Sequence, residues 1–403
     1  MSRPSILIAG GGTGGHVFPA LAVADSLTRM ADVDVVFVGT ERGLEARVVP
    51  ARGYALETLV VEPMKGGGVA RAVRGGVVAG AATLRSSSIL ARVRPSAVLS
   101  VGGYAAGPVS LAAAVARVPV ALLEPNAVMG LANRVLAPMC RRAYVAWPEA
   151  ARFTRSGAMR AYGVPLRDGF TPDPYVARGT ARVLVLGGSQ GARALNERMP
   201  DAIARARRAV GNVTVVHQTG KEKVDEVRAA YAREGIDDAL VTPFIEDVAA
   251  AMREADVIVG RAGASTVAEI TAVGRASILV PFPFAADDHQ AKNAAAVAAA
   301  GGALAIRQEA ADGVRLGREL ALLLGDDAAR VTMAARAASL GRPRAADDIA
   351  ADLLGIAGIA PRPSASSSPD VMRSPTSGGR PGTFSPTRGA RHRAALKGAR
   401  VGG

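Results

Sequence analysis

Near its start the chain reads SILIAGGGTGGHVFPAL over residues 5–21, an apolar run, a glycine-rich turn and a helix pattern. A short apolar run that ends in glycine is typical of a strand buried on both faces of a parallel sheet. The turn brings bare backbone N–H groups to the start of the helix, where they favour an anion. The stretch therefore predicts a strand–turn–helix unit of an α/β fold with a phosphate site at its turn.

A second copy of this unit lies about 175 residues further on, where residues 182–195 read RVLVLGGSQGARAL. Two copies predict two doubly wound, Rossmann-like domains facing a cleft. A chain of 403 residues, 49% hydrophobic, is long enough for two cores. Helical stretches separate the other predicted strands, which are residues 33–38, 97–101, 118–122, 213–218, 239–241, 257–259 and 277–280.

Gly10, Gly12 and Gly15 also have the spacing of the dinucleotide-binding fingerprint, with Glu41 as a ribose partner near the next predicted strand. This spacing leaves an NAD(P)-dependent oxidoreductase as an alternative. The duplicated unit, the denser glycine run and His16 at the helix start all argue against it. A non-catalytic protein that binds nucleotide sugars or nucleic acid is a third interpretation.

A third helix start follows another apolar run, where residues 257–269 read VIVGRAGASTVAE. Gly263 lets the backbone turn, and Ser265 or Thr266 can cap the new helix. Glu269 lies one turn in, where an acid often only balances the helix dipole. This helix start is the third candidate anion site.

The sequence around this helix start favours a nucleotide-sugar site. Pro243-Phe244-Ile245 precedes it, and residues 281–293 read PFPFAADDHQAKN. Together these segments supply a slot for a base, a carboxylate for ribose hydroxyls, N–H donors for a diphosphate and polar groups for a sugar.

The formal net charge of +14 is unevenly placed, with +9 in residues 1–164, −2 in 165–360 and +7 in 361–403. The last segment is rich in Pro, Ser, Gly and Arg, and we expect a disordered basic tail. No acid occurs between Glu62 and Glu124, where apolar side chains alternate with basic ones. That pattern suits an anionic membrane face, with a solvated helix or a nucleic-acid surface as alternatives. The expected membrane-facing residues are Lys65, Arg71, Arg74, Arg85, Arg92 and Arg94.

Five segments together resemble the signatures of the MurG family of peptidoglycan N-acetylglucosaminyltransferases. They are residues 10–22, VGGYAAGP at 101–108, residues 187–192, residues 261–269 and residues 287–293. The resemblance spans about residues 5–357 and implies a two-domain GT-B fold. It implies an inverting transfer of GlcNAc from UDP-GlcNAc to the C4 hydroxyl of lipid I, a lipid-linked diphosphate sugar, in peptidoglycan synthesis.

The resemblance also implies a domain organisation and a location. An acceptor- and membrane-facing domain would span residues 1–164 and a UDP-GlcNAc-binding domain residues 165–340, with a helix at 341–358 crossing back to the first. The protein would act peripherally at the cytoplasmic face of the cell membrane, in cell shape and division. Its partners would be UDP-GlcNAc, lipid I, the anionic membrane surface and other cell-wall synthesis proteins, with no specific nucleic acid.

The resemblance assigns roles to residues of this chain. Thr13, Gly14 and Gly15 line the cleft near the donor GlcNAc and the acceptor diphosphate, and Asn126 bonds the donor sugar. Around the UDP, the implied contacts are Arg167 and Ser189 on the diphosphate, the Ile245 backbone on uracil, Ala264, Ser265 and Thr266 on the α-phosphate, and Glu269 on the ribose. Gln290 bonds sugar hydroxyls.

For the catalytic base, His16 is the first candidate because the helix dipole lowers the pKa of a His at a helix start. Glu124 is the second. Backbone N–H groups and Arg167 can stabilise the departing UDP, so the mechanism requires no metal and no cofactor. Asp32 and Asp34 spell a metal-binding Asp-x-Asp, but their place before an apolar run indicates a solvated strand end.

Overall fold

The computed structural model describes residues 3–61, 69–179, 181–188 and 191–362, and side chains from residue 80 on within the third helix. Lys65 and Ser189 therefore lie outside the described residues, as do the side chains of Arg71 and Arg74. The expected basic tail is likewise outside them from residue 363 onward.

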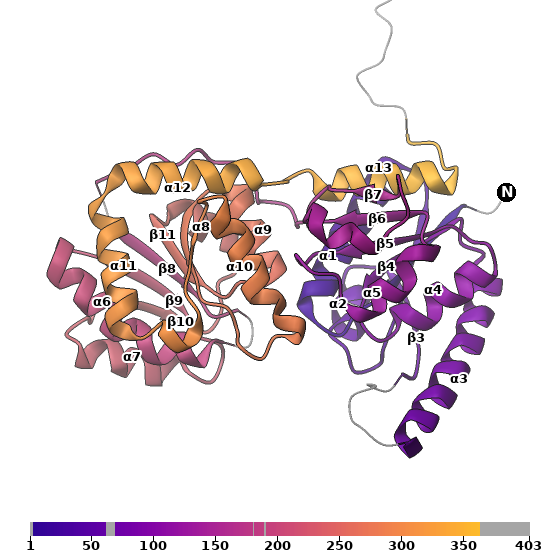
Figure 1. Cartoon of the computed structure of the whole chain (residues 1–403), viewed down its shortest axis with the longest axis horizontal. Coiled ribbons are helices and arrows are strands. Elements are labelled where there is room, and N and C mark those ends of the chain that lie inside the picture. The colour runs from indigo at the N-terminus through magenta and orange to yellow at the C-terminus, as the bar shows by residue number, and fades with distance from the viewer. Residues whose placement is uncertain (1–2, 62–68, 180, 189–190, 363–403) are drawn as a thin grey trace, which may run out of the picture. The chain divides into compact units, whose positions relative to one another are not determined.

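Within the described residues the chain builds two parallel sheets, each with helices on both faces (Figure 1). The first has the strand order β3-β2-β1-β4-β5-β6-β7. Its strands are β1 (Ser5–Gly10), β2 (Asp34–Gly39), β3 (Ala55–Thr58), β4 (Ala97–Gly102), β5 (Val120–Glu124), β6 (Arg142–Val145) and β7 (Met159–Arg160). Its helices are α1 (Gly14–Met30), α2 (Glu45–Ala51), α3 (Val69–Val93), α4 (Ala106–Val115) and α5 (Leu131–Leu136).

Alternate residues of the central strand β1 face the two sides of the first sheet. Ile6 and Ile8 pack with α1 and with the C-terminal helix α13 (Ala345–Ala357). Leu7 and Ala9 pack with the end of α3 and with α4. All six β1 residues are buried, which explains the unbroken apolar run in the sequence.

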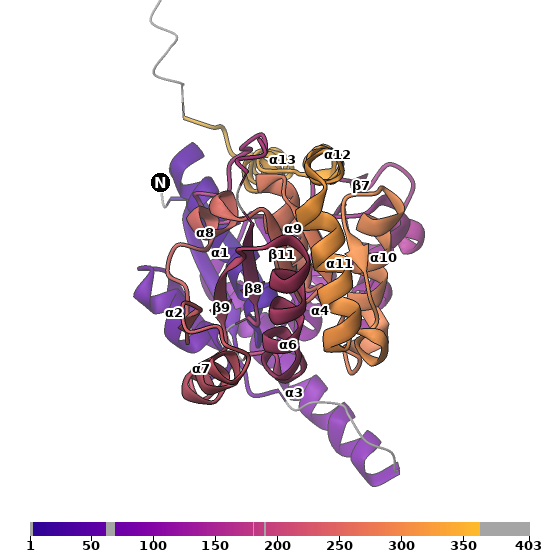
Figure 2. The same cartoon turned by 90° about the vertical axis from the view of Figure 1, so that its left-hand side faces the viewer.

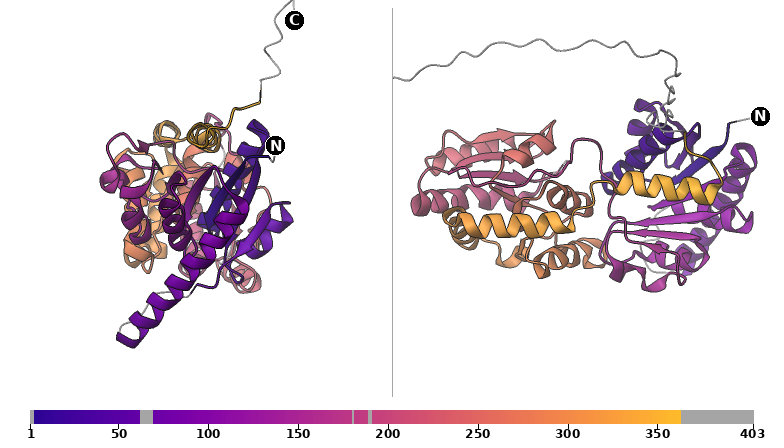
Figure 3. Two further views of the ribbon diagram at one scale, coloured as in Figure 1. Left: turned by 90° about the vertical axis from the view of Figure 1, so that its right-hand side faces the viewer. Right: turned by 90° about the horizontal axis from the view of Figure 1, so that it is seen from above.

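The helix α13 packs on the first sheet, although it is the last helix of the described chain and follows all the elements of the second sheet. Its apolar side joins the cluster around α1, and Figure 3 shows it beside this sheet. Polar bonds fix its position, because Ser26 Oγ donates to Asp347 at 2.8 Å and the Tyr144 hydroxyl donates to Asp352 at 2.9 Å.

The second sheet has the strand order β10-β9-β8-β11-β12-β13 among the described residues. Its strands are β8 (Arg182–Leu186), β9 (Thr214–Gln218), β10 (Leu240–Thr242), β11 (Val257–Gly260), β12 (Ala276–Leu279) and β13 (Leu304–Ala305). Its helices are α6 (Arg193–Val210), α7 (Val224–Arg233), α8 (Val248–Glu254), α9 (Ala264–Val273), α10 (His289–Ala299), α11 (Gly313–Gly325) and α12 (Asp327–Leu340). Helices α6, α7 and α11 pack on one face and α8, α9 and α10 on the other. Figure 2 shows these helices around the second sheet.

The expected fold class of two Rossmann-like domains is confirmed. The sequence patterns missed four short strands, β3, β6, β7 and β13. Each has two to four residues, and the β3 pattern of partly exposed residues lacks an apolar run. Such strands are held by pairing with a neighbour rather than by their own residues.

Candidate active site

The candidate site residues cluster at the points where strand order reverses. In doubly wound sheets, ligands bind at the carboxyl ends of strands beside such a switch point. The reversals lie between β1 and β4 in the first sheet and between β8 and β11 in the second. All four strands run into glycine-containing segments that the sequence analysis singled out.

At the first switch point two glycine segments meet backbone to backbone. The N–H of Gly11 donates to the carbonyl of Gly102 at 3.2 Å. A Cβ on Gly10 would lie 2.2 Å from the Gly102 oxygen, and one on Gly103 would lie 2.5 Å from the Gly11 oxygen. Only glycine allows this approach, so the two motifs seen in the sequence form one joint structure.

His16 lies in the first turn of α1, over the joined glycine segments. Its Nδ1 is 3.3 Å from the carbonyl oxygen of Gly11. A carbonyl can only accept, so Nδ1 carries the proton and Nε2 keeps its lone pair. Burial lowers the pKa of His16, which keeps the ring neutral at physiological pH. The geometry therefore provides a neutral imidazole with a free basic nitrogen.

Glu124, the second candidate base, is buried at the end of β5 and heavily hydrogen-bonded. Oε1 accepts from the backbone and side-chain N–H groups of Asn126, each at 3.1 Å. Oε2 accepts from Gly130 N at 2.9 Å and from Asn133 Nδ2 at 3.0 Å. With both oxygens engaged, this carboxylate is placed to orient Asn126 and shape the 124–130 loop.

Asn293 on α10 makes three hydrogen bonds near the site, and the sequence analysis did not single it out as a site residue. Its amide donates to Asn126 Oδ1 and to the carbonyl of Ala262, both at 3.2 Å, and its Oδ1 accepts from Ala127 N at 2.8 Å. The side chain is fully buried. Asn293 thus ties the predicted sugar-binding Asn126 to the segment before α9. Its position at the end of the quoted 287–293 segment is the sequence feature that could have indicated this role.

The second switch point carries the glycine turn after β8. Gly187 N donates to the Gln218 carbonyl at 3.1 Å, and a Cβ on Gly191 would lie 2.2 Å from the Thr219 oxygen. Gly188 has a φ of +76° and open space around its Cβ position. The turn is therefore supported by the end of β9.

A buried neutral network holds the end of β9, the backbone that this turn contacts. The side-chain amide of Asn196 donates to the Thr219 carbonyl, so its oxygen accepts from His217 Nε2 at 3.2 Å. His217 Nδ1 then accepts from the Tyr231 hydroxyl at 3.0 Å. Burial lowers the pKa of His217 to about 3, so the ring stays neutral.

The start of α9 offers an anion site beside the same switch point. Gly263 is the N-cap and has no side chain to satisfy the N–H groups that follow. The Ser265 hydroxyl is buried without a hydrogen-bond partner among the described residues. Burial raises the pKa of Glu269 to about 7, while the charge of Arg167 works against that rise. Ala264, Ser265, Thr266, Glu269 and Arg167 thus share one region.

The remaining predicted donor residues flank this region. The side-chain oxygen of Gln290 accepts from Phe282 N at 3.0 Å, which pins the turn before α10. Ile245 packs partly buried against the α8–α9 core, next to the exposed ring of Phe244. Thr13 is the N-cap of α1 without a side-chain capping bond, and Gly14 and Gly15 open that helix.

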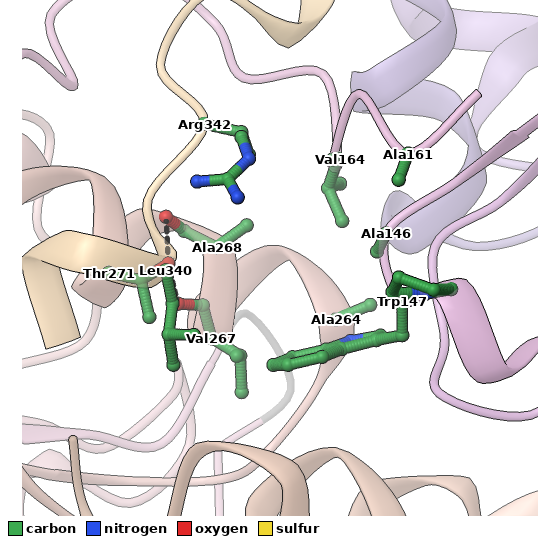
Figure 4. Close-up of a pocket in the computed structure, with 12 residues that line it drawn as sticks. Ala146, Trp147, Ala161, Val164, Ala264, Val267, Ala268, Thr271, Leu340 and Arg342 are labelled. Carbon is green, nitrogen blue, oxygen red and sulfur yellow. Dashed lines mark hydrogen bonds between the residues drawn. The ribbon is translucent and has the colours of Figure 1, made fainter. Parts of the chain in front are cut away.

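An apolar pocket of about 150 Å³ lies against α9. Figure 4 shows the Trp147 ring and the side chains of Val267 and Thr271 around it. Ala264 and Ala268 also line it, so the helix that bears Glu269 has a small void on this side. Trp147 packs with the second sheet's core.

The basic and acidic residues singled out outside these turns are largely exposed. Arg85, Arg92 and Arg94 are exposed near the end of α3, and Arg92 pairs with Glu57 at 2.7 Å. Asp32 and Asp34 are exposed before and at the start of β2, where Arg3 pairs with both at 3.0 and 3.4 Å. Among the described residues, no group of three His, Cys, Asp or Glu side chains is arranged to hold a metal.

Two Rossmann-like domains with glycine turns at both switch points form the GT-B fold, and two family matches place the chain among glycosyltransferases. The glycosyltransferase family 28 N-terminal domain matches residues 6–145, and the family 28 C-terminal domain matches residues 182–349. The chain belongs to the MurG family of this class, which confirms the resemblance seen in its motifs.

Similar proteins support this placement over nearly the whole chain. A UDP-N-acetylglucosamine–N-acetylmuramyl-(pentapeptide) pyrophosphoryl-undecaprenol N-acetylglucosamine transferase of Sorangium cellulosum is 51% identical, covering 93% of this chain and 92% of its own. The Myxococcus xanthus transferase of the same name is 43% identical over 86% of this chain and 91% of its own. The crystal structure of Acinetobacter baumannii MurG is 31% identical with a TM-score of 0.75, covering 88% of this chain and all of that one.

The oxidoreductase alternative is not favoured. Its expected ribose partner, Glu41, is exposed. The N–H of Gly12 in the fingerprint donates to the carboxylate of Glu45 at 2.7 Å, so it is not free for a pyrophosphate. Sequence reasoning missed Glu45, a buried acid at the start of α2 that lies against Gly11, Gly39 and Gly43.

Proposed function

We propose that this chain transfers GlcNAc from UDP-GlcNAc to the C4 hydroxyl of the lipid I sugar, with inversion at C1 and UDP as the second product. The family 28 match and the names of the relatives support this reaction. The observation that carries the proposal is the α9 start, with no side-chain cap, a buried Ser265 hydroxyl that has no partner in the described part of the chain, and the Glu269 carboxylate one turn on.

We assign the donor to the second sheet. The N–H groups at the start of α9 and at the turn after β8 would hold the diphosphate, with Arg167 and Ser189 beside it. Glu269 would accept both ribose hydroxyls, and the Ile245 backbone would meet the uracil edge. Gln290 and Asn126 would bond the sugar. Fixed dipoles and one Arg suit the negative charge that builds on UDP as the C1–O bond breaks.

We assign proton removal to His16. In the step, Nε2 takes the proton of the acceptor hydroxyl, the oxygen attacks C1, and the electron pair of the C1–O bond leaves with UDP. The free lone pair of Nε2 and the neutral ring support this role. Thr13, Gly14 and Gly15 would face the acceptor diphosphate. The four hydrogen bonds at Glu124 favour a positioning role for that residue through Asn126.

We further propose that the surface of α3 and α4 contacts the anionic membrane that carries lipid I. Within the described residues, no helix has both the length and the apolar character needed to cross a bilayer. Exposed apolar side chains on this surface include Leu84 and Val115, at 75% and 78% exposure. Arg117 and Arg141 line a groove with Val115, and this mixture of apolar and basic groups suits an interfacial contact.

The reaction is tested by following UDP release from UDP-GlcNAc with a lipid I analogue. We expect release only with both substrates present, and loss of turnover in His16→Ala. A nicotinamide-dependent absorbance change without UDP release would instead support the oxidoreductase. Sedimentation with anionic vesicles tests the surface, and unchanged binding of the double variant Arg117→Gln and Arg141→Gln would contradict it.

A further inference from the structure

A buried carboxylate lies beneath the first glycine turn. Glu45 begins α2 and is 1% exposed. One of its oxygens accepts from Gly12 N at 2.7 Å, and the other accepts from the backbone N–H and the hydroxyl of Thr40, at 2.9 and 2.8 Å. The side chain thus joins the end of β1 to the end of β2 through space.

Three glycines leave room for this carboxylate. A Cβ on Gly11 would lie 2.3 Å from Cδ of Glu45, and one on Gly39 would lie 2.5 Å from its Cγ. A Cβ on Gly43 would lie 2.1 Å from Oε2. Side chains cannot approach so closely, so the backbone on three sides is shaped around the acid. This accounts for glycines in the 39–43 segment that no phosphate contact explains.

The acid is held in its ionised form. Burial works to raise the pKa of Glu45, but the hydrogen bonds from Gly12 and Thr40 outweigh it and hold that pKa below its usual range. The pKa of His16 is lowered mainly by burial; the bond to Gly11 and the charge of Glu124 raise it, His289 lowers it, and the charge of Glu45 raises it by the smallest amount of the five. The charge of Glu45 therefore affects the pKa of the proposed base, His16, one helical turn beyond Gly12.

The bond to Gly12 also selects which N–H groups of the turn can meet an anion. Gly12 N is engaged by Glu45 and Gly11 N by the Gly102 carbonyl. The N–H groups of His16 and Val17 point back to the Thr13 carbonyl. The donors left for a ligand are those between them, at the N-cap and the first two residues of α1.

We infer that Glu45 is a positioning residue of the transfer reaction, which fixes the first glycine turn so that His16 and the free N–H groups of α1 face the acceptor. This inference rests on the proposed function. In this role Glu45, which is buried, acts through its bond to Gly12 and through its charge on His16.

The test compares Glu45→Gln with Glu41→Gln, a matched change at an exposed acid four residues earlier. Gln keeps the size of the side chain but loses the charge and one acceptor. We expect kcat with UDP-GlcNAc and a lipid I analogue to fall roughly ten- to a hundredfold in Glu45→Gln, because the base is displaced. The donor Kd should stay within twofold of wild type, since the proposed UDP contacts lie on the second sheet and Asn126 is held by Glu124 and Asn293, not by Glu45. Glu41→Gln should match wild type throughout.

Two further readouts separate positioning from general damage. Loss of the Glu45 charge lowers the pKa of His16, so the acid limb of the kcat–pH profile should move to lower pH. Amide hydrogen exchange in residues 10–16 should quicken in Glu45→Gln and not in Glu41→Gln. If Glu45→Gln does not fold, Glu45→Asp, which ends one methylene short of Gly12, carries the kcat, donor Kd and exchange measurements. Because Asp keeps the charge, the acid limb should not move in that variant.

The inference is overturned if kcat and exchange are unchanged, or if kcat and donor affinity fall together with the melting temperature. The exchange measurement needs no turnover. If wild-type protein transfers no sugar and yet exchange responds as expected, the proposed function fails while the role of Glu45 in the turn stands.

Discussion

The two glycine turns at the switch points look alike in sequence but are supported in opposite ways. The turn at residues 10–15 is bonded directly to an ionised carboxylate, Glu45. The turn after β8 meets the backbone at the end of β9, and that backbone is held by a neutral network of Asn196, His217 and Tyr231. Both supports are buried, and each meets the backbone at the end of a neighbouring strand.

This difference fits the ligands that we assign to the turns. The second turn is assigned to the donor diphosphate, which gains negative charge as the C1–O bond breaks, and neutral groups near that turn add no charge that would oppose it. Under the first turn the charge instead lies near a histidine that gains a proton during the reaction, and an anion stabilises the imidazolium that forms. The supporting residues thus distinguish a turn that serves the base and the acceptor from a turn that holds the departing UDP.

The largest expected effect comes from removing the proposed base at the first turn. Replacing His16 with Ala removes the proposed base, and kcat should fall by about a hundred- to ten-thousandfold. The donor Kd, measured by calorimetry with UDP-GlcNAc, should change little, because His16 is on the other sheet. Equal losses in kcat and donor affinity would place His16 in donor binding instead.

The second prediction tests the neutrality of the other support. Because the folded pKa of His217 is about 3 and the ordinary value is 6.5, folding favours the neutral ring. Its contribution to stability is complete above about pH 6.5 and is lost as pH falls toward 3, by a few kcal/mol at most. Urea unfolding across this pH range should show a smaller loss in His217→Gln than in wild type. Parallel curves would contradict a neutral His217.

A third change sharpens the assignment of the donor to the second sheet. Glu269→Ala should raise the donor KM by about ten- to a hundredfold, because two bonds from ribose to a carboxylate are lost, with a smaller change in kcat. Burial raises the pKa of Glu269 to about 7, so wild-type donor affinity should weaken as pH falls below 7. Glu269→Gln should bind the donor with no such dependence.

The smallest expected effect is a difference in the free energy of unfolding between substitutions at two glycines of the same turn. Gly188 and Gly191 have nearly equal φ values, +76° and +74°, so Ala is similarly strained at both. Only at Gly191 would the new Cβ meet an atom, the Thr219 oxygen. The free energy of unfolding should therefore fall about 1–3 kcal/mol further in Gly191→Ala than in Gly188→Ala. Equal losses would show that the turn is not held against β9.

The sequence was sufficient to predict features that depend on neighbours along the chain. The apolar runs before Gly10 and Gly187 predicted the central strands. The expected cap by Ser265 or Thr266 was wrong, because α9 begins at Ala264 with Gly263 as its N-cap and both hydroxyl residues lie inside the helix. Features built through space were missed. Glu45 looks like any acid at a helix start until three glycines from separate segments are found around it. The edge strand β13 has two residues and exists only because β12 offers a partner.

A structure of the protein with UDP-GlcNAc bound tests the central assignment most directly. We predict the ribose hydroxyls on the Glu269 carboxylate and the diphosphate against the N–H groups that open α9 and follow β8. Density for the nucleotide at the first turn, with its diphosphate at Gly14 and Gly15 and its ribose away from Glu269, would contradict the account.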